Sequence, residues 1–205
     1  TVIDEIMKAS EASDMHALAY FYCSRSTAEP QRASPRSILA CIARQLSRQS
    51  QAQLIAPPTL ALYNKLHSMD GSRGTPSITD LSCLIRELTE VYDRSMIVVD
   101  ALDECDQNTR WELVEALESI TESASLVKVF VSSREEGDLR LSLQTHSGLQ
   151  VTSLENDDDI RKFVEFETDR LVAKKQLLAY IRKKETKEEL TSLIKKDVTC
   201  KANGM

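Results

Sequence analysis

The amino-acid sequence predicts an α/β protein in which a parallel sheet is flanked by helices on both faces. Short apolar runs rich in β-branched residues alternate with longer segments in which apolar residues recur every three to four positions. The run 96–99 is apolar throughout, as in strands that are buried on both faces of a parallel sheet. Strands that alternate with helices of this length favour parallel strands joined by helical crossovers.

The first half of the chain contains clear helix starts. Pro35 follows Ser34, and proline fits the first turn of a helix because that turn does not need its N–H. Ser77 or Thr79 is expected to cap a helix after a loop at 69–76 that contains Gly71 and Gly74. The expected elements are a helix at 1–10, a strand at 17–23, a helix at 34–49, a shorter helix from 57 and a helix from 77 with a stripe of Leu81, Leu84, Ile85 and Leu88.

The second half continues the alternation and then becomes helical and charged. The expected elements are a strand at 96–100, a helix from Asn108 with Trp111, Val114, Leu117 and Ile120 inward, a strand at 127–132, a shorter strand at 149–154, and a helix from Asp157 or Asp158 with Ile160, Phe163 and Val164 inward. From about residue 171 the chain is expected to form a helical C-terminal extension.

Composition narrows the class of protein. With 205 residues, 41% hydrophobic and 28% charged, the chain fits one sizeable core and a small appendage. The net charge of −6 argues against a nucleic-acid surface, and no apolar run approaches the length of a membrane helix. The five cysteines are widely spaced without a C-x-x-C pair, which indicates a reducing, cytoplasmic setting without disulfides or zinc.

Carboxylates gather where the run 96–99 ends. Asp100 follows this strand directly, and Asp103 and Glu104 come next. Open α/β sheets bind ligands at the carboxyl ends of their strands, and paired carboxylates there suit a magnesium–nucleotide site. Two alternatives stay open: Asp100 could simply end the strand, and Asp103 and Glu104 could favour the N-terminus of the next helix through its dipole.

The extended string around Asp100 resembles the Walker B element of the NACHT nucleotide-binding domains, within the STAND class of signalling NTPases. It is most similar to the nephrocystin-like N-terminal NACHT module of fungal NOD-like proteins. Those proteins have a small residue after the strand aspartate, here Ala101, and an acidic pair just beyond, here Asp103 and Glu104. The resemblance runs from about Thr1 to the C-terminus.

The resemblance implies roles for four residues. Asp100 would hold Mg²⁺, Glu104 would orient the attacking water with Asp103 as second choice, and Arg134 would sense the γ-phosphate. For Arg134, the alternative is a surface ion pair with Glu135 or Glu136.

Other reactive or aromatic side chains have simpler interpretations. No histidine lies near Cys105 in the sequence, and the carboxylates around this thiol would raise its pKa, so it is expected to be structural. The aromatic residues 20–22 are expected to be core residues of one strand, and Trp111 is expected to be a packing residue.

A phosphate-binding P-loop is missing from the sequence. No Gly-Lys-Ser or Gly-Lys-Thr occurs, and the earliest glycine is Gly71. We therefore interpret the chain as a fragment without its first strand and the P-loop; the alternative is true loss. Relatives have the strand order 5-1-4-3-2, in which 17–23 would be strand 2, 96–100 strand 3, 127–132 strand 4 and 149–154 strand 5, so the strand that ends in Asp100 should lie between strands 2 and 4. The expected domains are an incomplete NACHT domain at 1–170 and a helical segment at 171–205. Without strand 1, strands 4 and 5 should lie roughly 10 Å apart, and the isolated chain should be poorly stable.

The expected function is part of a NACHT-type switch that binds and slowly hydrolyses ATP or GTP with Mg²⁺ in the parent protein; the base preference stays open. No nucleotide is expected to bind tightly to this chain. The expected partners are other copies of the protein and the flanking effector and repeat domains, with neither nucleic acid nor membrane. The rival hypothesis is a non-catalytic, NACHT-like interaction module or degenerate fragment that does not bind nucleotide.

Overall fold

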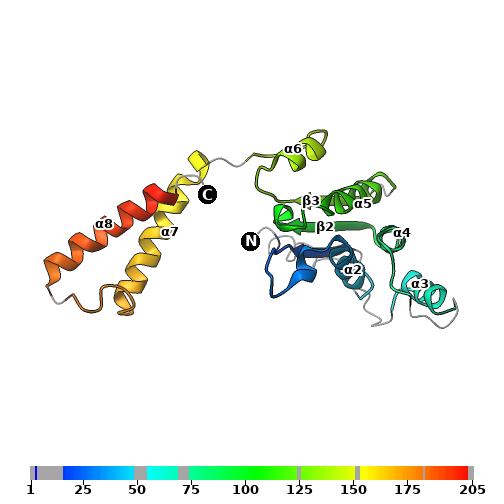
Figure 1. The fold of residues 1–205 in the computed structure, drawn as a ribbon, viewed down its shortest axis with the longest axis horizontal. Coiled ribbons are helices and arrows are strands. Elements are labelled where there is room, and N and C mark those ends of the chain that lie inside the picture. Colours follow the sequence, from blue (N-terminus) through cyan, green and yellow to red (C-terminus); the bar gives the residue numbers. More distant parts are fainter. Residues whose placement is uncertain are drawn as a thin grey trace. The chain divides into compact units, whose positions relative to one another are not determined.

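The computed structural model of the chain describes residues 3, 16–48, 55–68, 74–123, 126–150, 153–181 and 183–202. It contains two compact units, Thr1–His146 and Ser147–Met205. The elements of the first unit are β1 (His16–Tyr22), η1 (Pro30–Ala33), α2 (Pro35–Leu46), α3 (Pro57–Ser68), α4 (Ile78–Thr89), β2 (Arg94–Asp100), η2 (Leu102–Glu104), α5 (Arg110–Ser123), β3 (Val127–Val131) and α6 (Gly137–Leu143), where η marks a 3₁₀ helix (Figure 1). The second unit has α7 (Ser153–Ala173) and α8 (Lys184–Ala202).

The three strands form one parallel sheet in the order β1-β2-β3. In register, Asp100 lies opposite Tyr22 of β1, and Val99 lies opposite Val131 of β3. The strand that ends in Asp100 is therefore the middle strand, as the strand order of the similar NACHT domains implied. The α/β class, with a parallel sheet flanked by helices, is confirmed.

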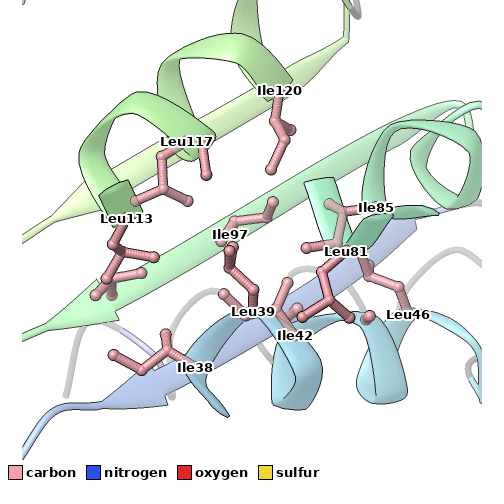
Figure 2. Close-up of a cluster of buried hydrophobic side chains, with 14 of the residues drawn as sticks. Ile38, Leu39, Ile42, Leu46, Leu81, Ile85, Ile97, Leu113, Leu117 and Ile120 are labelled. Atoms are coloured by element: carbon pink, nitrogen blue, oxygen red, sulfur yellow. The ribbon is translucent and has the colours of Figure 1, made fainter. Parts of the chain in front are cut away.

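The main core lies between the sheet and the helices α2, α4 and α5. Figure 2 shows side chains of these helices gathered around Ile97 of β2, which is fully buried. The predicted stripe of α4 is buried in full, and α2 buries an equivalent stripe: Ile38, Leu39, Ile42 and Leu46. Their apolar periodicity is therefore the cause of this layer, because each helix has one continuous apolar face to bury.

The opposite face of the sheet has a smaller cluster. Leu18 and Val98 are buried there with Ile3, and Tyr20 and Met96 pack against them. Ile3 is helical, while the rest of the helix predicted at 1–10 lies outside the described residues. The expectation that residues 20–22 are all core is wrong for Tyr22, which is 40% exposed at the end of β1.

The starts of α4 and α2 follow the predicted residues, whereas α5 begins at Arg110 rather than directly after Asn108, and α7 begins at Ser153. Ser77 caps α4 with a capping box: its hydroxyl accepts a hydrogen bond from Asp80 N, and the Asp80 carboxylate accepts one from Ser77 N. Thr79 lies inside the helix. Pro35 occupies the first turn of α2, as predicted, although Ser34 makes no side-chain capping bond.

Four further predictions are wrong: the strand at 149–154, the start of the next helix at Asp157 or Asp158, and the inward positions of Trp111 and Phe163. Leu149 and Gln150 form no strand, and Ser153 already belongs to α7; residues 151–152 lie outside the described residues. Leu149 is 88% exposed. Trp111 is 57% exposed and Phe163 is 65% exposed. α5 instead buries Leu113, Val114, Ala116, Leu117 and Ile120.

The second unit is a helical pair in which α7 contacts α8. Val164 and Thr168 are its buried residues on α7, and Lys195 of α8 lies 2.8 Å from the Asp169 carboxylate. The domain boundary predicted after residue 170 falls within α7 and stays a prediction. No described helix is both long and apolar enough to cross a membrane.

Candidate functional site

The end of β2 turns sharply into η2. Ala101 has φ 56° and ψ 51°, the left-handed conformation that is unfavourable for residues with a Cβ. This turn directs the chain from Asp100 straight into η2, where Asp103 and Glu104 lie. On the β1 side, Cys23 N donates a hydrogen bond to Asp100 O at 2.9 Å. All three predicted carboxylates therefore lie at the carboxyl edge of the sheet.

Ser132 links the Asp100 carboxylate to the end of β3. Its hydroxyl donates a hydrogen bond to Asp100 Oδ1 and accepts one from Ala101 N at 3.0 Å. The backbone continues this link, because Leu102 N donates to Ser132 O at 2.9 Å. Sequence reasoning had noted Ser132 only as part of the strand end, without a role.

Asp103 holds the segment that contains Arg134. The residue is 5% exposed, and its Oδ1 accepts a hydrogen bond from Arg134 N at 3.0 Å. The Arg134 guanidinium is 84% exposed and has its Nε 3.8 Å from Asp103 Oδ2. The ion partner of Arg134 in the described part of the chain is thus Asp103, and not Glu135 or Glu136 as the alternative had supposed.

Glu104 faces the loop that follows β1. Its Oε2 accepts a hydrogen bond from Arg25 N at 3.0 Å. The Arg25 guanidinium donates to Asp103 O and lies 3.9 Å from Glu136 Oε1. Loops that follow all three strands are therefore joined through η2.

Arg110, in the first turn of α5, is a buried charge that sequence reasoning missed. Its side chain is 3% exposed and forms ion pairs with Glu136 and Asp138. Burial disfavours its charged form, but the hydrogen bonds to Asp138 and Glu136 outweigh this effect, and the pKa of Arg110 is raised. The hydrogen bond from Arg110 correspondingly lowers the pKa of Asp138. The sequence shows Arg110 close to the predicted helix start and the acidic residues Glu136 and Asp138 well beyond it, and this spacing gives no indication that the three side chains meet.

The two thiols beneath this edge are not activated. Burial is the main reason that the pKa of Cys23 is raised to about 12. Electrostatic repulsion from Cys105, Asp100 and Asp103 also contributes to this increase. Burial raises the pKa of Cys105 to about 11, and its thiol donates a hydrogen bond to Ala33 O at 3.0 Å. Thiols that stay protonated are poor nucleophiles, which agrees with the structural role expected for Cys105.

The described residues contain no group of three or more His, Cys, Asp or Glu side chains arranged to hold a metal ion. An open depression of about 540 Å³ lies between the loop after β1 and the start of α5. Arg25, Pro30, Ser34 and residues 106–109 are among its lining residues. The site residues Asp100, Asp103 and Arg134 do not line it.

Comparisons with known proteins give one result. The family model described as nephrocystin 3, N-terminal, matches residues 1–134, which is more than half of the 205 residues. No curated protein and no solved structure matches the chain significantly. The matched region includes β1, β2, β3 and all four predicted site residues. The chain belongs to the nephrocystin 3, N-terminal family.

Proposed function

We propose that this chain is part of a NACHT-type switch, whose parent protein binds and slowly hydrolyses ATP or GTP and thereby controls its self-association. The observation that carries this proposal is the meeting of Asp100, Asp103 and Arg134 at the carboxyl edge of a parallel sheet, within a family of nephrocystin-like modules. Ligands of open α/β sheets bind at such edges. Flanking effector and repeat domains of the parent are its proposed further partners.

The donor set suits Mg²⁺. This ion commonly takes one or two protein carboxylates and completes its shell with water and substrate phosphates, so a cluster of three acidic ligands is not required. Asp100 has a partly exposed carboxylate with the Ser132 hydroxyl beside it. Asp100 would hold the ion, which when bound neutralises charge on the phosphates.

Burial separates the roles of Asp103 and Glu104. The Asp103 carboxylate is nearly buried and already accepts the Arg134 amide, whereas Glu104 is half-buried. Glu104 is therefore the better residue to accept a proton from an attacking water, and Asp103 the better one to hold Arg134. The guanidinium of Arg134 lies beside Asp103 but is 84% exposed, so a terminal phosphate could reach it.

The test uses a longer form of the protein that has a G-x-x-x-x-G-K-S/T loop ahead of Thr1, natural or grafted from a family member. Glu104→Gln should lower the hydrolysis rate at least about tenfold with nucleotide affinity nearly unchanged, because it removes the proton acceptor but keeps the size. Asp100→Ala should weaken Mg²⁺-dependent binding itself. Equal hydrolysis by wild type and Glu104→Gln would refute the role of Glu104 and move it to Asp103.

A second candidate function is a non-catalytic interaction module. The observation in its favour is that every acidic side chain of the site already has a protein donor: Ser132 for Asp100, Arg134 N for Asp103 and Arg25 N for Glu104. Such bonds explain the acidic string without any ligand. The P-loop form separates the two candidates, since it should bind nucleotide only if the first is right.

A further inference from the structure

We infer that Arg110 is a positioning residue, which holds residues 132–138 against η2 and thereby sets where Arg134 lies beside Asp103. This positioning role depends only on the contacts of Arg110. Its effect on nucleotide binding rests on the proposed function, in which Arg134 contacts the terminal phosphate.

Arg110 joins three segments with one guanidinium. Nε donates to Asp138 Oδ2 at 2.6 Å, Nη2 donates to Glu136 Oε2 at 2.5 Å, and Nη1 donates to Asp103 O at 3.3 Å. Arg110 itself begins α5, while Asp103 lies in η2 and Glu136 precedes α6. One side chain thus fixes the exit of β3 to the exit of β2.

The hydrogen bond from Arg134 N to Asp103 Oδ1 is held by Arg110 at both of its ends. On one side, Arg110 fixes the backbone of Asp103 through its carbonyl. On the other, it fixes Glu136 and Asp138, which lie two and four residues beyond Arg134. Removal of the Arg110 guanidinium should therefore let residues 132–138 move while the sheet stays intact.

The shape of the guanidinium matters as well as its charge. A planar fork offers five N–H donors in fixed directions, and an ammonium on a flexible stem cannot span the same three acceptors. Arg25 contacts two of the same groups, Asp103 O and Glu136, but its side chain is 53% exposed. Solvent screens an exposed pair, so Arg25 should contribute much less than Arg110.

The experiment measures amide hydrogen exchange by NMR on the full chain without nucleotide. Arg110→Met should lower the protection factor of the Arg134 amide at least about tenfold, equivalent to about 1.4 kcal/mol. The β2 amides report on the fold and should keep their protection. Arg140→Met is the matched control, because Arg140 lies in the same region but its pair with Glu135 is exposed; it should leave Arg134 unchanged.

Further variants separate positioning from general stability. A residue that only stabilises the fold would lower protection throughout the first unit, whereas a positioning residue lowers it at 132–138 and leaves the β2 amides protected. Arg110→Lys keeps the charge and should still lose protection at Arg134, because the fork is gone. If Arg110→Met does not fold, Asp138→Asn and Glu136→Gln remove the partners instead and should show the same local loss.

Unchanged protection at Arg134 in Arg110→Met, or in both partner variants, overturns the inference, as does a uniform loss across β2 in the partner variants. Local loss at Arg134 supports it, whatever the P-loop form does with nucleotide. If that loss occurs but Arg134→Ala leaves hydrolysis by the P-loop form unchanged, the sensor role fails while the positioning role stands. The two proposals can therefore fail separately.

Discussion

Ser132 donates a hydrogen bond to the Asp100 carboxylate and so joins the last residue of β2 to the first residue after β3. The same hydroxyl accepts a bond from the amide of Ala101, the residue in the left-handed conformation. One small side chain therefore orients the carboxylate and stabilises an unfavourable backbone turn. Substitution of Ser132 therefore tests how much these two hydrogen bonds stabilise the carboxyl edge of the sheet.

Ser132→Ala should lower the free energy of unfolding by about 2 kcal/mol. The variant leaves a partly buried carboxylate and the Ala101 amide without this partner, and a bond to a charged group contributes more than a neutral one. Urea denaturation followed by circular dichroism measures the change. Ser133→Ala is the control, since Ser133 is exposed and its hydroxyl donates to Arg134 O in its own loop; equal stability of all three proteins would contradict the prediction.

Ser77→Ala should lower the free energy of unfolding by about 1 kcal/mol, because it removes the side chain that caps α4. Thr79→Ala should change it by less than about 0.5 kcal/mol, because Thr79 is exposed inside the helix. Thermal or urea denaturation of the pair distinguishes the two candidates for the cap. A larger loss in Thr79→Ala would show that the cap has been misassigned.

Cys23 and Cys105 should resist alkylation in the folded protein. With their pKa values raised to about 12 and about 11, both thiols are protonated at pH 8, and both are buried. Exposed Cys200 should react with iodoacetamide first, and mass spectrometry of the modified peptides identifies the order. Cys200→Ser should leave the slow labelling of Cys23 and Cys105 unchanged, whereas rapid labelling of either would contradict their burial.

The same thiols make stability fall at alkaline pH. The unfolded chain ionises a thiol near the ordinary pKa of 9.0, while the folded chain keeps Cys23 and Cys105 protonated up to about 12 and about 11. Their contribution is therefore full below pH 9 and is lost as pH rises toward the folded values. Cys105→Ala should show a shallower decrease in urea midpoint between pH 8 and pH 10.5 than wild type.

The chain as given should bind ATP or GTP weakly or not at all. Its sequence lacks the Gly-Lys-Ser/Thr loop, which would supply several charge-assisted hydrogen bonds of about 1.5–3 kcal/mol each. Losses of this size compound to several orders of magnitude in affinity, since about 1.4 kcal/mol is tenfold. Calorimetry with Mg-ATP and Mg-GTP measures the affinity, with a titration of Mg²⁺ alone as the control. Micromolar binding of either nucleotide would refute the prediction.

Local patterns in the sequence were enough to predict α2 and α4, whereas the central place of β2 followed from the strand order of the domains that the sequence resembles. Ser77 and Pro35 act within one helical turn, and the stripe from Leu81 to Leu88 needs only its own periodicity to identify the buried face. The four apolar residues before Asp100 similarly predicted a strand buried on both sides. For both helices the determining interactions lie within a few residues along the chain.

Tertiary structure alone decided which charged and aromatic side chains became buried. Arg110 is buried because Asp138, 28 residues away, reaches its guanidinium, whereas Trp111 beside it remains in solvent. Asp103 holds Arg134 across 31 residues, and no spacing rule predicts that hydrogen bond. Leu149 had a strand-like sequence, yet it is 88% exposed and forms no strand. Residue type and periodicity thus determined the elements, while partners distant in sequence determined the site, because burying a charge is favourable only where its counter-charges meet it.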